Sequence, residues 1–309
     1  MRLFYPADDR RERGSELVDT YLALAAPGRR RPSPADIADL AAGGLRRRLR
    51  TAPGAGFRLA GLLALITTSA FASWWAVLEV LAPRAPWYTQ SGPFLSLGVA
   101  AWALWLLAAV VHAAAPGRWP RRAALVAVLV TAGLPPAATL TGGFRPPLSV
   151  LVPQIVLGLV ALGAPAHSRR WARLTPLVAA ALTVPVALAI EPRLGFNGDY
   201  YPSAVVALPA AAVTLLIGAT LLALGWAARH DSRGAWALLI LLTPIGLLAL
   251  NPIGAMLDTN LGRPIVPAWS SMAAAGVLVA VTGPALLLLA LAATGRRRAR
   301  GAPSNPAGG

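Results

Sequence analysis

The chain has 309 residues, with 28 arginines, no lysine, 12 acidic residues and no cysteine, and its formal net charge is +16. Hydrophobic residues make up 56% of it and charged residues only 13%, whereas soluble domains carry about 25% charged residues. This composition excludes an ordinary soluble globule. The lack of cysteine excludes disulfides, cysteine-ligated metal centres and thiol catalysis.

Residues 1–56 are charged and interrupted by proline, and they predict a cytoplasmic amphipathic arm of two short helices. The first helix is expected over about 9–25. The second begins with Ser33 as N-cap and Pro34 at the first helical position. It ends in four arginines, which we expect to contact anionic lipid headgroups: Arg46, Arg47, Arg48 and Arg50. Alternatively, residues 8–50 dock a cytoplasmic protein partner.

The segment from Arg11 to Arg50 reads RERGSELVDTYLALAAPGRRRPSPADIADLAAGGLRRRLR. It resembles the N-terminal segment of uncharacterised multi-pass membrane proteins from high-GC actinobacteria. The resemblance covers about 40 of the 309 residues, and it implies an inner-membrane location and a signalling or permease-like prefix. It implies no catalytic or binding residues.

Eight apolar runs follow the arm, each long enough to cross about 30 Å of hydrocarbon as a helix. The sequence therefore predicts an all-α polytopic membrane bundle over residues 57–294, followed by a basic, disordered cytoplasmic tail over 295–309. The expected spans are 57–82, 94–115, 123–141, 148–166, 174–190, 203–228, 236–252 and 268–294. Three tail arginines are further candidates for lipid-headgroup contact: Arg296, Arg297 and Arg298.

Arginine alternates between the connections, with 24 of the 28 on one side of the predicted bundle and four on the other. Basic residues gather in cytoplasmic loops of membrane proteins. Both termini are therefore predicted to be cytoplasmic, in the inner membrane of the cell. The whole net charge lies on that side, where anionic lipids attract it, so we do not expect a nucleic-acid partner.

The opposite, outer connections contain the most distinctive polar residues. Four acids and four arginines in these short loops predict either a solvated cap of partly paired charges or a shallow outward-facing binding pocket. The candidate binding residues are Glu79, Arg145, Glu191, Arg193, Asp199, Tyr200, Asp258 and Arg263.

Within the spans, the polar residues predict structural roles. No Asp, Glu or Arg lies near the centre of a span, which argues against a carboxylate-based proton pathway or ion pump. Thr67, Thr68 and Ser69 are expected to bond backbone carbonyls, and Gln154 to bond across helices or to line a cavity. Three scattered histidines have no metal-binding spacing, so no metal or cofactor is expected, and no catalytic triad or carboxylate dyad indicates an enzyme.

Three functions remain after these exclusions. The first is a membrane scaffold or signalling component whose cytoplasmic arm docks a partner or anionic lipid. The second is a permease-like protein for an apolar or amphipathic solute, because spans without central charge suit such solutes better than ions. An intramembrane enzyme is a distant third.

The cysteine-free chain allows a direct test of this topology by single-cysteine labelling in intact cells. An impermeant thiol reagent should label cysteines placed in the outer connections, and a cysteine at Gly117 should react only after the membrane is permeabilised. Labelling of Gly117→Cys from outside would overturn the topology. The outer test positions are Gln90, Phe144, Gly198 and Asn260.

Overall fold

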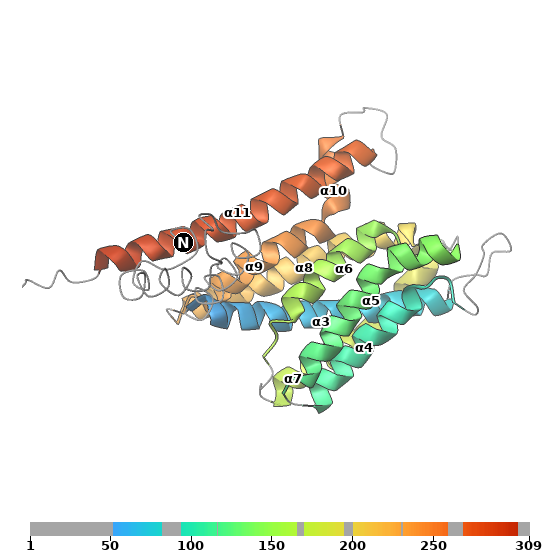
Figure 1. Cartoon of the computed structure of the whole chain (residues 1–309), viewed down its shortest axis with the longest axis horizontal. Helices are drawn as coiled ribbons and strands as arrows, with labels where there is room; N and C mark the ends of the chain where they lie inside the picture. The colour runs from blue at the N-terminus through green and yellow to red at the C-terminus, as the bar shows by residue number, and fades with distance from the viewer. Residues whose placement is uncertain are drawn as a thin grey trace, which may run out of the picture. The chain divides into compact units, whose positions relative to one another are not determined.

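The computed structural model describes residues 52–81, 94–115, 117–165, 170–194, 200–229, 231–258 and 268–301. Every regular element among these residues is a helix, so the all-helical prediction is confirmed (Figure 1). The arm predicted over 1–56 lies outside the described residues up to position 51, and the first described helix already begins at Ala52.

Each of the eight predicted apolar runs contains a helix. The elements are α3 (Ala52–Leu81), α4 (Gly98–Ala114), α5 (Trp119–Thr141), α6 (Leu148–Ala161), α7 (Arg170–Ile190), the 3-10 turn η1 (Glu191–Leu194), α8 (Tyr201–Ala227), α9 (Arg233–Leu248), α10 (Leu250–Leu257) and α11 (Trp269–Gly301). Helix α11 continues past residue 294 into the stretch predicted as a tail. The side chains of Arg296, Arg297 and Arg298 are not among those described, nor are Arg46, Arg47, Arg48 and Arg50.

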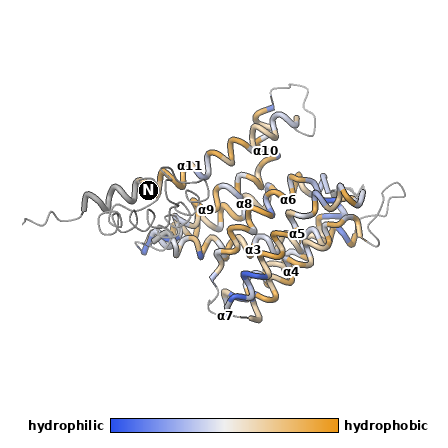
Figure 2. Tube along the Cα trace, in the orientation of Figure 1, coloured by the Kyte–Doolittle hydropathy of each residue, from blue (hydrophilic) through white to orange (hydrophobic). Residues whose placement is uncertain are grey.

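Five of these helices are long and apolar enough to cross a membrane, namely α3, α5, α7, α8 and α11. A sixth span results if α9 and α10 form one broken span. The apolar helices α4 and α6 are shorter, with 17 and 14 residues, and α6 covers only about 21 Å at the helical rise. The fold thus has five or six apolar helices that fit a membrane-embedded protein, fewer than the eight spans predicted (Figure 2).

The run predicted as a single span over 236–252 is bent by 66° between α9 and α10. Helix α9 ends at Leu248, and Pro252 lies in the first turn of α10. Because proline has no backbone N–H, it cannot donate to the carbonyl of Leu248, and its ring disfavours a continuous helix at that point. Proline is tolerated in a first helical turn, so the chain starts a new helix instead.

The chain divides into two compact units. One comprises Met1–Ala55 and Pro284–Gly309, of which residues 52–55 and 284–301 are described as helix. The other comprises Gly56–Gly283. All contacts described below lie within this second unit.

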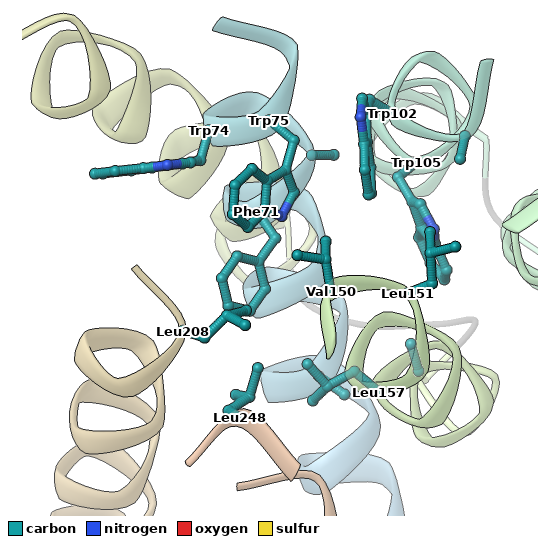
Figure 3. Close-up of a cluster of buried hydrophobic side chains, with 14 of the residues drawn as sticks. Phe71, Trp74, Trp75, Trp102, Trp105, Val150, Leu151, Leu157, Leu208 and Leu248 are labelled. Carbon is teal, nitrogen blue, oxygen red and sulfur yellow. The ribbon is translucent and has the colours of Figure 1, made fainter. Parts of the chain in front are cut away.

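Within Gly56–Gly283, α4 packs against α5 and α7, and α8 packs most extensively against α9. The core is rich in tryptophan: Trp75, Trp102 and Trp105 are almost fully buried (Figure 3). The Trp75 ring lies 6.3 Å from the Trp102 ring and 6.4 Å from the Phe71 ring, centroid to centroid. Such aromatic contacts add about 0.5–1.5 kcal/mol per pair beyond area burial, so this cluster holds α3 against α4.

The polar residues inside the helices have the structural roles expected of them. Thr67 donates to Leu63 O at 2.9 Å and Ser69 donates to Leu65 O at 2.7 Å. Gln154 of α6 donates from Nε2 to Thr68 O of α3 at 3.3 Å. The prediction of an interhelical hydrogen bond at Gln154 is therefore confirmed, and this bond ties α6 to α3.

Glycine allows two helices to approach closely at the junction between α8 and α9. A Cβ atom added at Gly234 would lie 2.5 Å from Ala223 Cα and 3.0 Å from Leu222 O. These atoms belong to the backbone, so they cannot be displaced by a rotamer change. A small residue is therefore required at position 234 for this helix pair.

Gly234→Ala should accordingly lower the free energy of unfolding by about 1–3 kcal/mol through overpacking. The matched control is Gly225→Ala in α8, where an added Cβ meets nothing within 4 Å. This control should be neutral or raise stability by up to about 1 kcal/mol, because alanine favours helix. Thermal unfolding of the two purified variants in detergent measures the difference, and equal stability would contradict the close packing.

Candidate functional site

Two carboxyl groups are buried where α3 and α7 end and α4 and α8 begin, which we call the Glu79 end of the bundle. Glu79 is 2% exposed and Glu191 is 1% exposed. The sequence predicted both in outer connections, either as solvated charges or around an outward-facing pocket. They are instead enclosed because Ser96 and Tyr200 bond to Glu79, and Ser203 bonds to Glu191, where these helix ends meet.

The Glu79 carboxyl is the centre of a network that joins three helices. Its Oε2 accepts a hydrogen bond from the backbone N–H of Ser96 at 2.8 Å. Its Oε1 accepts from the hydroxyls of both Ser96 and Tyr200. Hydroxyl and amide groups, rather than arginines, therefore satisfy this carboxyl, and they connect the end of α3 to the starts of α4 and α8.

Tyr200 is the other half of this network. Its hydroxyl accepts a hydrogen bond from Trp102 Nε1 at 3.2 Å, and its ring lies 5.4 Å from the Trp75 ring. The side chain is completely buried. Burial, followed by the nearby Glu79 charge, raises the pKa of Tyr200 well above its usual value, so the phenol remains a donor.

The second carboxyl, Glu191, is only partly satisfied. Its Oε2 accepts a hydrogen bond from the Ser203 hydroxyl at 2.6 Å. Its Oε1 is buried and has no hydrogen-bond partner, and the same is true of Nε1 of Trp74. The Trp74 side chain lies within hydrogen-bonding reach of Glu191, so the indole N–H and this oxygen face each other as donor and acceptor.

An apolar groove of about 420 Å³ runs between α3, α7 and α8 from this point. Its size lies within the range of about 300–1,000 Å³ usual for ligand pockets. Trp74 lines it, and in Figure 3 the Trp74 ring points away from the other labelled aromatic rings. The remaining lining residues are Leu63, Ile66, Thr67, Ala70, Phe71, Ala179, Thr183, Val186, Ile190, Val206, Ala207, Ala210, Ala211, Thr214, Leu215, Gly218 and Ala219.

The groove is apolar despite its three threonines. Thr67, Thr183 and Thr214 each donate their hydroxyl to the carbonyl four residues earlier in their own helix, at 2.8–2.9 Å. None of these hydroxyl protons remains free for a ligand. The groove exists because α7 packs on α4 and α8 packs on α9, with few direct contacts between α7 and α8. Val186 and Val206 are exposed along this seam.

The other predicted binding residues that the structure describes are not bonded to the two buried carboxyls. Arg145 is half-buried and donates to Pro146 O at 3.1 Å, and Arg193 is exposed on η1. Asp258 accepts a hydrogen bond from Ala268 N at 2.9 Å. Asp199 and Arg263 lie outside the described residues. Among the described members of the predicted set, the structure joins Glu79 to Tyr200 directly and places Glu191 one helical turn of α8 away, at Ser203.

The opposite end of the bundle holds one more buried polar residue, His112 of α4. It is 2% exposed, and neither ring nitrogen has a hydrogen-bond partner. Arg173 of α7 donates to His112 O and Ala113 O, at 3.3 and 2.7 Å. This arginine therefore caps the end of α4.

Sequence reasoning missed Trp74, Ser96 and Ser203 as site residues. A tryptophan within an apolar span carries no signal of a binding site, and the two serines belong to no motif. One signal was available: α8 places small residues at 207, 210, 211 and 218, where bulky side chains would fill the groove. Within the described segments, no group of three His, Cys, Asp or Glu residues could hold a metal ion.

Comparisons with known proteins add no relatives. No known protein family, curated protein or solved structure matches the chain.

The Glu79 network makes a quantitative prediction. Tyr200→Phe removes one donor to Glu79 and leaves Trp102 Nε1 without its acceptor, which should lower the free energy of unfolding by about 1–3 kcal/mol. Glu79→Gln should destabilise by a similar amount. Because the two side chains bond each other, the double variant should lose less than the sum, with a coupling of about 0.5–3 kcal/mol. Strictly additive effects in a thermal double-mutant cycle would show that the two groups act independently.

Proposed function

We propose that the protein is an eight-span integral protein of the inner membrane, with both termini cytoplasmic, that binds an apolar or amphipathic molecule in the groove between α3, α7 and α8. The observation that carries the binding proposal is the groove itself. It is apolar along its length, has the volume of a ligand pocket and is open at the α7–α8 seam.

The helix contacts support alternating directions through the membrane. The end of α3 meets the starts of α4 and α8 at Glu79. The end of α4 meets the start of α7 at Arg173, and the start of α9 meets the end of α8 at Gly234. These contacts agree with a chain that crosses back and forth, and the arginine distribution places the Arg173 end in the cytoplasm.

The shape of the groove favours a membrane-derived ligand over a water-soluble one. A lateral opening between two apolar helices faces hydrocarbon when the bundle is in a bilayer, so a lipid-like molecule can enter without crossing water. Charged solutes are disfavoured because the lining offers no free hydroxyl or charge along its length. A permease-like or carrier role for an apolar or amphipathic solute follows.

The alternative, a scaffold or signalling role through residues 8–50, rests on the sequence alone because those residues lie outside the described part of the chain. The same is true of the proposed contacts between anionic lipids and the arginines at 46–48, 50 and 296–298. The groove gives the permease-like role a physical site, so we place it first.

Binding can be tested by photocross-linking in liposomes, with a phosphatidylcholine that carries a diazirine on one acyl chain. Cross-links should map to the groove-lining peptides of α3 and α8. Ala211→Phe, which fills the groove, should reduce them severalfold. The matched control, Ala103→Phe, adds the same ring to an exposed position of α4 away from the groove and should leave them unchanged.

A truncated chain separates the two functions. Removal of residues 1–50 should leave cross-linking intact if the groove is the functional site, and it should abolish activity if the arm is. Equal labelling of the groove and of the exposed surface of α4 in the full chain would overturn the groove proposal.

A further inference from the structure

We propose that the groove holds one acyl chain of a phospholipid from the outer leaflet, with the headgroup at the Glu79 end and the terminal methyl near the middle of the bilayer. This inference rests on the proposed function and on the topology proposed with it. It names the ligand class, the number of chains and the direction in which the chain lies.

The three walls of the groove have nearly the same length. The lining residues fall within 63–74 on α3, 179–190 on α7 and 206–219 on α8. At the helical rise these segments span about 16–20 Å. A saturated chain, with single bonds of about 1.5 Å that meet at about 111°, advances about 1.25 Å per carbon. The groove is therefore as long as an extended chain of about 13–16 carbons.

The groove is narrow for this length. Its volume of about 420 Å³, spread over about 16–20 Å, gives a mean cross-section of about 21–26 Å². Apolar groups in contact lie about 4.0–4.5 Å apart, so one extended chain occupies about 16–20 Å². A second chain or a fused sterol ring system does not fit beside it. A helix is about 10–12 Å in diameter, so the groove does not seat a helix of a second copy either.

The groove lies towards one end of the bundle. At the Glu79 end its lining reaches Ile190, the last residue of α7, and Val206 in the second turn of α8. At the other end, α7 begins nine residues before Ala179 and α8 continues for eight residues beyond Ala219. A bilayer core of about 30 Å has leaflets of about 15 Å, so the groove covers the depth of one leaflet. In the proposed topology that leaflet is the outer one.

The lining of the groove suits an alkyl chain with its headgroup at the membrane surface. Its three threonine hydroxyls are bonded within their own helices, so the walls offer dispersion contacts to the chain. An empty groove would leave these walls without contact atoms, and a chain from the bilayer restores them through the α7–α8 seam. The turn η1, which carries the exposed Arg193, follows Ile190 directly, and it puts a cation at the membrane level of the lipid phosphate.

The direction of the chain can be tested on the unmodified full-length protein in liposomes. Two phosphatidylcholines are compared, one with a diazirine near the ester and one with a diazirine near the terminal methyl of the same chain. The first should label the lining near Trp74 and Ile190, and the second should label the lining near Leu63 and Ala219. The reverse order, or equal labelling of both ends by both probes, would overturn the inference.

Buried lining residues separate a chain in the groove from lipid on the outer surface of the bundle. Phe71 and Leu215 line the groove and are buried, so a probe reaches them only from inside it. Ala211→Phe should remove the labelling of these two residues and leave the labelling of exposed helix surfaces unchanged.

Two glycines of α8 offer a matched pair of variants for the depth that the chain reaches. An added Cβ meets nothing within 4 Å at either Gly218 or Gly225, and of the two, Gly218 lines the groove. Gly218→Phe should lower labelling by the methyl-end probe about fivefold or more, because its ring overpacks the deep end, and should leave ester-end labelling unchanged. Gly225→Phe should leave both unchanged. Loss of neither signal, or equal loss of both, in folded Gly218→Phe would contradict the inference.

The number of chains is tested by competition with the methyl-end probe. A lysophosphatidylcholine, which has one chain, should compete as strongly as unlabelled phosphatidylcholine at equal chain concentration, and cholesterol should not compete. Displacement by cholesterol as strong as that by the lysolipid would show that the groove is wider than one chain.

The outcomes distinguish this inference from the proposed function. If both probes label the buried lining without a gradient, the groove binds lipid in no fixed direction, and only the inference fails. If neither probe labels the buried lining, and Ala211→Phe leaves all cross-linking unchanged, the groove is not a lipid site and both fail.

Discussion

The bundle depends on a carboxyl group that is removed from water and satisfied by donors from two other helices. Glu79 ends α3, yet its oxygens are bonded by Ser96 at the start of α4 and by Tyr200 at the start of α8. A buried carboxyl without such donors would cost several kcal/mol, so the three helices must meet at this point. The aromatic rings of Trp75 and Trp102 pack around the same hydroxyl and exclude water from it. The hydrogen bonds to Glu79 and the packing of the aromatic rings therefore stabilise the same arrangement of the ends of α3, α4 and α8.

This arrangement also explains why a groove remains. Helix α8 is fixed at its start by Tyr200 and along its length by α9, whereas α7 is held by α4 through Arg173 and by the turn η1. Along the length of α7 that precedes η1, few contacts join α7 to α8. Small residues on α8 widen the seam further, because alanine and glycine at 207, 210, 211 and 218 do not fill the space. The groove thus results from the packing of α7 on α4 and of α8 on α9, which leaves space between α7 and α8.

The helices themselves can be predicted from the sequence, because a long apolar run in lipid can satisfy its backbone hydrogen bonds only within a helix of its own. Their lengths are harder to predict: α6 begins at Leu148 as expected but ends at Ala161 instead of 166, and Pro252 divides the seventh run. Glu79, Glu191 and Tyr200 stand out as polar residues beside apolar runs. Their burial does not, because it depends on contacts between residues up to 121 positions apart. The position of Trp74 in the groove lining cannot be predicted, since nothing in the sequence distinguishes its indole from that of Trp75.

Helix α6 is only 14 residues long, and this has a consequence for the surrounding lipid. In the proposed eight-span topology α6 crosses the membrane, and a bilayer about 30 Å thick does not match a helix of about 21 Å, so the hydrophobic mismatch would be relieved by local thinning or by neighbours that shield the ends of α6. Part of that shielding is visible where Leu97 N bonds to Phe144 O just before α6. In that topology, a change in bilayer thickness, and so in acyl-chain length, would act on α6 and, through the bond from Gln154 to Thr68 O, on α3, the wall of the groove that carries Trp74.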